Sequence, residues 1–270
     1  VDNRLMSLQL IKNDMTDAVM FGPDGNNLLP AAVLYKKNIL ALRGSFRPVT
    51  KVNLDMFEKS YDIFIRDKQV DQNNTIVIFE ITLSNLKASG EIDEQDFMDR
   101  AELLCSLGHS VMISKFQEYY KLVEYFNNFT KNRIGLTMGV NNLVDIFDEK
   151  YYRHLSGGIL EAFGKLFFKD LQVYLYPMKN PDTGQIMTSN NVKVHPRMKE
   201  LYKFFKYNGK VMDIIDYEPD VMHIFSRDVL KKLMNNEEGW EKMLPEGIAE
   251  IIKEKNLFVR KTIEIDAEES

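Results

Sequence analysis

The 270-residue chain contains one cysteine, Cys105, so an internal disulfide is impossible. The segment around Cys105 is apolar, which predicts a small buried side chain. This sparing use of cysteine is typical of a reducing, cytoplasmic setting. No apolar run approaches the ~20 residues of a membrane helix, and no signal-peptide pattern opens the chain, so no membrane partner is expected.

The chain has no excess of basic residues. Lys and Arg total 35 against 40 Asp and Glu, a formal net charge of -5, which argues against a protein that coats nucleic acid. The histidines are too few and too scattered for metal-ligand spacing, so no protein-held metal is expected. These histidines are His109, His154, His195 and His223.

Several nucleotide and catalytic fingerprints are absent from the chain. It has no Walker A motif, no G-x-S-x-G and no G-x-G-x-x-G. The missing glycine fingerprint makes an NAD(P)-dependent oxidoreductase an unfavoured interpretation. There is also no Cys/His pair that would support nucleophilic catalysis.

What the chain does contain is alternation between strand-length apolar runs and helical patterns. Apolar residues recur at helix spacing after most runs, as in Leu54, Phe57, Tyr61 and Phe64. The alternation predicts an α/β fold, a Rossmann-like doubly wound parallel sheet with a helical carboxyl-terminal extension. The predicted strands are 17–21, 39–43, 75–82, 110–114, 133–138 and 171–176.

Composition and regularity divide the chain into three expected parts. Residues 1–37 form an amino-terminal segment, which is either a remnant of a longer chain or the end of a further domain. Residues 38–212 form the Rossmann-like domain. Residues 213–270 form an extension with one predicted helix at 246–255 and an acidic tail.

The stretch RGSFRPVTKVNLDM, residues 43–56, follows a predicted strand and opens a predicted helix. It resembles the signature of nucleotidyltransferases that include the nicotinate/nicotinamide mononucleotide and phosphopantetheine adenylyltransferases, approximately G-[ST]-F-D-P-[VI]-[TH]-x-G-H. Three positions depart from that pattern. Arg47 replaces the Asp, Val52 the Gly, and Asn53 the second His. The matching residues are Gly44, Ser45, Phe46, Pro48, Val49 and Thr50, followed by Leu54 and Asp55.

The order of segments around this stretch also resembles the family, from about residue 38 to residue 208. Lys87 follows a strand, where the family has a phosphate-contacting Lys. The run from Gly139 to Leu143 resembles a strand ending in G-x-D-x-L, with Asn141 in place of the Asp. Ser189 and Lys193 fall near a weaker I-S-S-T-x-x-[RK] match. The chain also resembles a bacterial family described as adenylyltransferase-like, whose members carry a further amino-terminal region.

The resemblance implies transfer of AMP from ATP to a small phosphorylated metabolite, with nicotinate or nicotinamide mononucleotide as first candidate and NAD biosynthesis as setting. It places Thr50 and Asn53 as catalytic donors and implies ATP as cofactor, with Mg²⁺ arriving on ATP. The partner is then a small nucleotide, and a homo-oligomer stays open. The implied nucleotide-binding residues are Gly44, Ser45, Phe46, Arg47, Lys87, Ser189 and Lys193, and the implied substrate-binding residues are Gly139 and Asn141.

An alternative follows from the same three departures. Asn53 cannot carry a histidine's positive charge, and Val52 crowds a place that suits glycine. The alternative is a catalytically inactive nucleotide-binding or assembly module on the same fold. Separately, Glu80 lies inside an apolar strand, where a buried carboxylate needs a partner, so we expect it to pair with Arg43 or Arg133 or to mark a site.

Overall fold

The computed structural model describes residues 2–87, 90–168 and 171–258. Ten strands are assigned within these ranges, and eight of them form one sheet. The strands of the large sheet are β1 (Ala18–Phe21), β2 (Asn27–Leu28), β3 (Asn38–Arg43), β4 (Thr75–Thr82), β5 (Ser110–Ser114), β6 (Ile134–Gly139), β7 (Leu171–Tyr176) and β10 (Val211–Asp213), while β8 (Met178–Lys179) and β9 (Ile186–Met187) pair as a separate hairpin.

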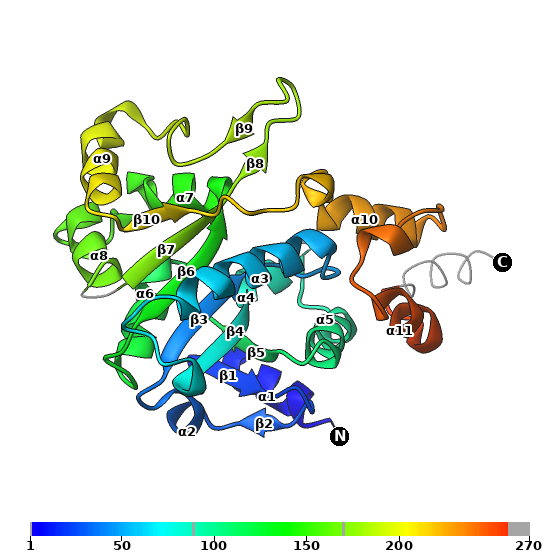
Figure 1. The fold of residues 1–270 in the computed structure, drawn as a ribbon. Coiled ribbons are helices and arrows are strands. Elements are labelled where there is room, and N and C mark those ends of the chain that lie inside the picture. The colour runs from blue at the N-terminus through cyan, green and yellow to red at the C-terminus, as the bar shows by residue number, and fades with distance from the viewer. Residues whose placement is uncertain (1, 88–89, 169–170, 259–270) are drawn as a thin grey trace.

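The order of strands across the large sheet is β10-β7-β6-β3-β4-β5-β1-β2 (Figure 1). The six strands from β10 to β5 are parallel, and taken in chain order they have the 3-2-1-4-5-6 arrangement of a doubly wound nucleotide-binding fold. The predicted Rossmann-like sheet is therefore confirmed. The run at 17–21 forms β1, which pairs antiparallel with β5, so the first 37 residues extend this sheet.

Eleven α-helices connect or cover the strands within the described residues. The pattern of Leu54, Phe57, Tyr61 and Phe64 lies on a helix, and the helix predicted at 246–255 is present within those bounds. The helices are α1 (Asn3–Lys12), α2 (Pro30–Leu34), α3 (Lys51–Ile65), α4 (Leu83–Leu86), α5 (Glu94–Ser106), α6 (Tyr119–Asn127), α7 (Val140–Ile146), α8 (Gly158–Leu166), α9 (Lys199–Tyr207), α10 (Ser226–Met234) and α11 (Ile248–Lys255).

Strand β3 shows why the sheet needs helices on both faces. Ile39 and Ala41 belong to the apolar cluster that includes residues of α6, α7, α8 and α9, whereas Leu42 belongs to the one that includes residues of α1, α5, α10 and α11. Leu40 packs with Phe64 of α3 on that second face. Successive side chains of a strand point to opposite faces, so a continuous apolar run is buried only if both faces are covered.

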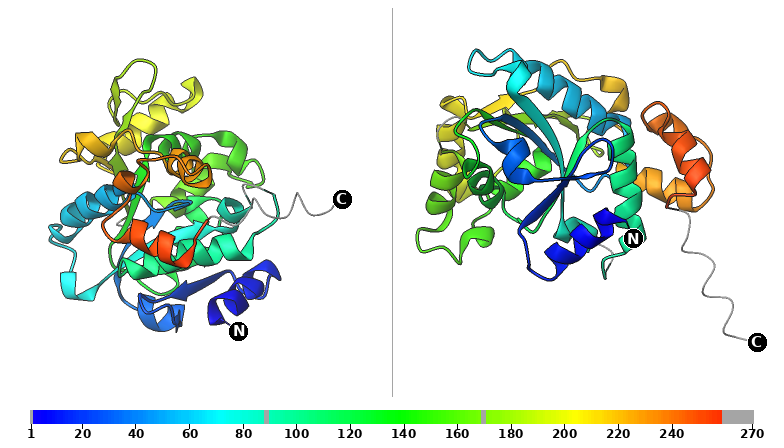
Figure 2. Two further views of the ribbon diagram at one scale, coloured as in Figure 1. Left: turned by 90° about the vertical axis from the view of Figure 1, so that its right-hand side faces the viewer. Right: turned by 90° about the horizontal axis from the view of Figure 1, so that it is seen from below.

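The carboxyl-terminal helices α10 and α11 pack outside α5 rather than on the sheet, as Figure 2 shows from two further directions. Trp240, which lies between them, is buried in the same apolar cluster as Leu103 and Leu104 of α5. The fold is thus a doubly wound sheet with a helical extension on one side. None of the described helices is both long and apolar enough to cross a membrane.

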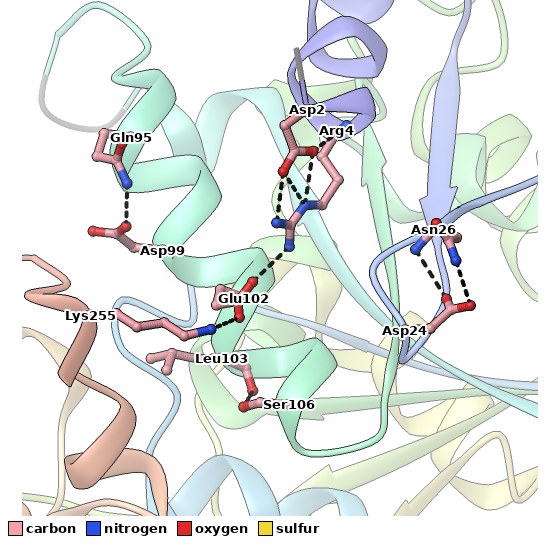
Figure 3. A network of polar contacts seen from close by, with 10 residues as sticks. All are labelled: Asp2, Arg4, Asp24, Asn26, Gln95, Asp99, Glu102, Leu103, Ser106 and Lys255. Atoms are coloured by element: carbon pink, nitrogen blue, oxygen red, sulfur yellow. Dashed lines mark hydrogen bonds and ion pairs between the residues drawn. The ribbon is translucent and has the colours of Figure 1, made fainter. Parts of the chain in front are cut away.

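Helix α5 holds elements from both ends of the chain through Glu102 (Figure 3). Arg4 of α1 donates to Glu102 at 3.0 Å, and Lys255 of α11 donates to the same carboxylate. The Lys255 and Arg4 hydrogen bonds keep the pKa of Glu102 below its usual value although burial opposes this. Cys105 on this helix is buried as predicted, and burial raises the pKa of its thiol to about 11.

Candidate active site at the carboxyl edge of the sheet

The chain reverses its direction of travel across the sheet beside β3. From β3 it proceeds outward through β4 and β5, and it then returns to β6 on the other side of β3 before reaching β7 and β10. In doubly wound sheets, ligands bind at the carboxyl ends of the strands at such a switch point. The loop 44–50, which carries most of the signature, leaves β3 at this edge and leads into α3.

Gly44 and Phe46 are explained by their packing against each other. A Cβ atom added to Gly44 would lie 2.8 Å from Cζ of Phe46, closer than real contacts allow. Phe46 itself has a positive φ of 46° and is 1% exposed, and its ring packs on Phe79 with centroids 5.3 Å apart. The absence of a side chain at Gly44 therefore leaves space for the Phe46 ring of the same loop.

Thr50 and Asn53 form a cap at the start of α3. The backbone N–H of Thr50 and its hydroxyl both donate to Oδ1 of Asn53, each at 3.0 Å. These bonds decide which end of the Asn53 amide faces Thr50, since only the oxygen accepts. Nδ2 of Asn53 then remains as a donor, and no described residue accepts a hydrogen bond from it. Thr50 is fully buried, and its hydroxyl hydrogen is committed to this cap.

Arg47 is held against α5 through an ion pair with Asp96, and Arg100 pairs with the same carboxylate. Nη1 of Arg100 also donates to the carbonyl oxygens of Ser45 at 3.1 Å and Asn85 at 3.3 Å. Burial lowers the pKa of Arg100, and Asp96 opposes this shift. One guanidinium thus ties the signature loop to the segment after β4, while Arg47 is not a free surface charge.

The remaining predicted phosphate ligands make no described contact with this network. Lys87 and Lys193 are solvent-exposed, and no described residue forms an ion pair with either of them. Ser189 is buried, with its N–H and hydroxyl donating to Asp213 at 2.8 and 2.6 Å. Its hydroxyl is therefore engaged with the strand β10, and the structure does not bring Ser189 to the signature loop by any described contact.

The two predicted substrate residues lie at the end of β6. Gly139 ends this strand and precedes α7, and a Cβ added there would meet nothing within 4 Å. Asn141 is exposed, whereas the next residue, Asn142, lines a cavity at the carboxyl edge. The residues that the family pattern indicated therefore lie beside the cavity, and Asn141 is one residue before a side chain that lines it.

That cavity has a volume of about 320 Å³ and collects side chains from several strand ends. Arg43 comes from β3, Thr82 from β4, Tyr119 from the segment after β5, and Asn142 and Asp145 from α7 after β6. It therefore spans the switch point of the sheet. The sequence predicted none of these residues as ligand-binding, because each is remote in sequence from the others.

Arg43 is the centre of a buried polar network beside the cavity. It donates to Glu80 through Nε at 2.7 Å and Nη2 at 3.0 Å, and to the carbonyl oxygen of Gln117 through Nη1 at 2.8 Å. Ser114 donates to the same carboxylate at 2.6 Å. Burial acts to lower the pKa of Arg43, but Glu80, Tyr119 and Glu118 together outweigh it and keep the pKa above its usual value. The predicted pairing of Glu80 with Arg43 is confirmed.

Tyr119 lies beneath the Arg43 guanidinium, which sits 4.2 Å from the ring centroid. Its hydroxyl is buried and has no hydrogen-bond partner among the described residues; Asn142 is close enough to affect its pKa but makes no hydrogen bond of acceptable geometry. Burial raises the pKa of Tyr119 to about 12, against the opposing effect of Arg43. Buried polar atoms are rarely left without a hydrogen-bond partner, so the Tyr119 hydroxyl distinguishes this cavity wall from an ordinary protein interior.

Comparison with known proteins supports the fold that this geometry indicates. No family model and no curated protein matches the chain. Among solved structures, a Plasmodium falciparum nicotinic acid mononucleotide adenylyltransferase complexed with NaAD superposes with a TM-score of 0.50 at 14% identity, covering 82% of this chain and 97% of its own. The chain shares the doubly wound fold of this enzyme.

The same Plasmodium falciparum enzyme complexed with APC matches with a TM-score of 0.49 at 14% identity over the same shares of both chains. At such identity the likeness concerns the nucleotidyltransferase fold and not the chemistry. The expected fold is confirmed, and the resemblance read from residues 43–56 is in keeping with it.

Proposed function

We propose that the chain transfers AMP from ATP to a small phosphorylated metabolite, with nicotinate or nicotinamide mononucleotide as the first candidate acceptors. One observation carries the proposal. The signature loop and the cavity adjoin at the switch point of a nucleotidyltransferase-type fold, because Arg100 binds the carbonyls of both Ser45 in the loop and Asn85 in the cavity wall. Such a transfer would supply a dinucleotide of the NAD class.

In the proposed reaction a phosphate oxygen of the acceptor attacks the α-phosphorus of ATP. A new P–O bond forms to the acceptor, the bond to the β-phosphate oxygen breaks, and pyrophosphate leaves with the bonding electrons. Asn53 donates from Nδ2 to a phosphoryl oxygen, and Thr50 acts through Asn53 by holding its amide in one orientation. The protein's contribution is alignment and charge stabilisation.

Three cations that the resemblance indicates would neutralise phosphate charge in this scheme. Lys87 and Lys193 are exposed and would contact phosphate in this proposal, whereas Arg47 would have to share its charge with Asp96. Mg²⁺ would enter with ATP, since the described residues contain no group of three or more His, Cys, Asp or Glu side chains placed to hold a metal. In this proposal Gly44, Ser45 and Phe46 shape the nucleotide-binding turn, and Gly139 and Asn141, at the end of β6, would bind the acceptor. Ser189, which has no described contact with the signature loop, would bind nucleotide only from a second segment.

A catalytically inactive nucleotide-binding or assembly module is the second candidate, and the signature loop itself favours it. The Thr50 hydroxyl donates its hydrogen within the helix cap, and Arg47 forms an ion pair with Asp96. Val52 packs against the apolar cluster that contains Leu40 and Phe64. In this alternative the three departures preserve the fold of the loop without its chemistry.

Calorimetric titration with ATP–Mg²⁺, followed by a pyrophosphate-release assay with each mononucleotide, separates these candidates. We expect ATP binding and slow release, with Asn53→His raising turnover about tenfold because a charged donor is worth roughly 1.4 kcal/mol more than a neutral one. Asn27→His, in the exposed edge strand β2, is the matched control and should change nothing. Binding without release supports the nucleotide-binding module, and no ATP binding rejects both candidates that depend on ATP and leaves only an assembly module.

A further inference from the structure

The cavity at the switch point carries a surplus of negative charge. Arg43 is the only basic residue among the described residues that line it, and Glu80 neutralises it through two hydrogen bonds. Of the two acidic lining residues, Glu118 pairs with Lys121 at 2.8 Å, whereas no described cation lies within ion-pair distance of Asp145. An anion entering this cavity would meet no uncompensated positive charge.

The wall of the cavity is also aromatic and offers one unused hydrogen-bonding group. Tyr119, Tyr151 and Tyr152 all line it. Tyr152 donates its hydroxyl to the carbonyl of Ile146 at 2.8 Å, so its polar end is satisfied and its ring is what remains for a ligand. Tyr119, which is 8% exposed, has a buried hydroxyl without such a partner. A ligand group that hydrogen-bonds here would relieve an unsatisfied donor.

We propose that this cavity binds a planar nitrogen heterocycle that is positively charged or neutral, contacts the tyrosine rings, hydrogen-bonds the Tyr119 hydroxyl and is selected against negative charge by Asp145. Tyrosine faces attract cations through the ring quadrupole, which adds to the attraction of the carboxylate. The volume of about 320 Å³ lies at the lower end of the range for ligand pockets and suits a ring rather than a whole dinucleotide.

Applied to the proposed transfer, on which this step rests, the cavity holds the base of the acceptor. The positive pyridinium ring with a neutral carboxamide fits it better than the same ring with a carboxylate. The preferred acceptor is therefore the amide, nicotinamide mononucleotide, over the acid, nicotinate mononucleotide.

Ring compounds that lack phosphate test the cavity without the rest of the site. We would titrate the full chain calorimetrically with 1-methylnicotinamide as cation, nicotinamide as neutral probe and nicotinate as anion. We expect 1-methylnicotinamide to bind about tenfold or more tighter than nicotinate, with nicotinamide between them. Equal affinities, or tighter binding of nicotinate, would overturn the proposal.

Two variants connect the preference to individual residues. Asp145→Asn should reduce the difference between cation and anion to about threefold or less without lowering thermal stability, because Asp145 is exposed and unpaired among the described residues. Tyr119→Phe should weaken 1-methylnicotinamide and nicotinamide alike by about fivefold. Asp182→Asn and Tyr207→Phe, which lie outside the cavity, are the matched controls. An unchanged preference in Asp145→Asn would refute the selective role of that carboxylate.

A parallel ATP–Mg²⁺ titration keeps the failure of this inference separate from failure of the proposed function. If ATP binds and pyrophosphate is released but the probes show no charge preference, the cavity assignment is wrong and the transfer stands. If the probes bind with the expected preference but ATP does not bind, the cavity assignment stands and the transfer is wrong.

Discussion

Replacing Gly44 with Ala tests whether this glycine serves the loop or a ligand. The backbone at Gly44 does not have a positive φ, so alanine is not strained by conformation there. The added Cβ would instead lie 2.8 and 2.9 Å from two ring atoms of Phe46, which is 1% exposed and packed on Phe79. A buried ring cannot move aside freely, so we expect the overpacking to cost about 1–3 kcal/mol of the free energy of unfolding.

Urea unfolding followed by far-UV circular dichroism measures this cost. A loss of that size corresponds to a midpoint about 0.5–1 M lower in urea. Gly164→Ala is the matched control, since a Cβ there meets nothing within 4 Å inside α8, and it should stabilise the protein by about 0.5–1 kcal/mol.

A double variant separates steric overlap from any other effect at Gly44. Phe46→Ala alone should cost about 3–5 kcal/mol because it empties a buried site. Combined with Gly44→Ala it should cost no more, since the ring that the new Cβ would strike is gone. Strict additivity, or a Gly44→Ala variant of unchanged stability that loses only ATP affinity, would refute the packing explanation and favour a glycine kept for close approach of phosphate.

Three other perturbations follow from buried polar groups. Glu80→Gln leaves the Arg43 charge buried beside a neutral partner and should cost about 3–5 kcal/mol in urea unfolding; a loss below about 1 kcal/mol would contradict this. Tyr176→Phe removes a 2.5 Å hydrogen bond to the buried Asp55 carboxylate. A calorimetric melt should show a loss of about 1–3 kcal/mol in the free energy of unfolding. An unchanged melting temperature would show that the Asp55 carboxylate is satisfied without this hydrogen bond. Burial lowers the pKa of His109 to about 4 from 6.5, so between these pH values the unfolded chain binds a proton that the folded chain does not bind. The free energy of unfolding should therefore fall by about 2 kcal/mol as the pH drops from 6.5 to 4. His109→Phe should remove this part of the acid sensitivity in urea melts at pH 7 and 4.5, and an equal slope with pH in both proteins would reject the assignment.

The fold was predictable because local patterns carried it. Each of the six apolar runs forms a strand within one residue of the expected bounds, and the alternation with helices indicated a doubly wound sheet. Direction and position at the sheet edges were not predictable in the same way. The run at 17–21 is as apolar as its neighbours, yet β1 lies antiparallel to β5, because its pairing depends on residues about 90 positions away. The three-residue β10 has too little pattern to be seen without its partner β7.

Some features of the candidate site were likewise predictable from local sequence, whereas others depend on the folded structure. The sequence by itself determined the strand–turn–helix at residues 43–56, the need of the buried Glu80 for a cation, and the lack of any metal-ligand spacing among the histidines. These follow from residue type and spacing along a short stretch of chain.

Only the tertiary structure decided what those residues contact. It placed the Phe46 ring over Gly44, paired Arg47 with Asp96, and turned the Asn53 oxygen toward Thr50. It also assembled the cavity around Tyr119, whose wall comes from β3, β4 and the segments after β5 and β6. Strand ends that are distant in sequence become neighbours only when the parallel sheet forms, so the charge and shape of a site at that edge are properties of the folded chain.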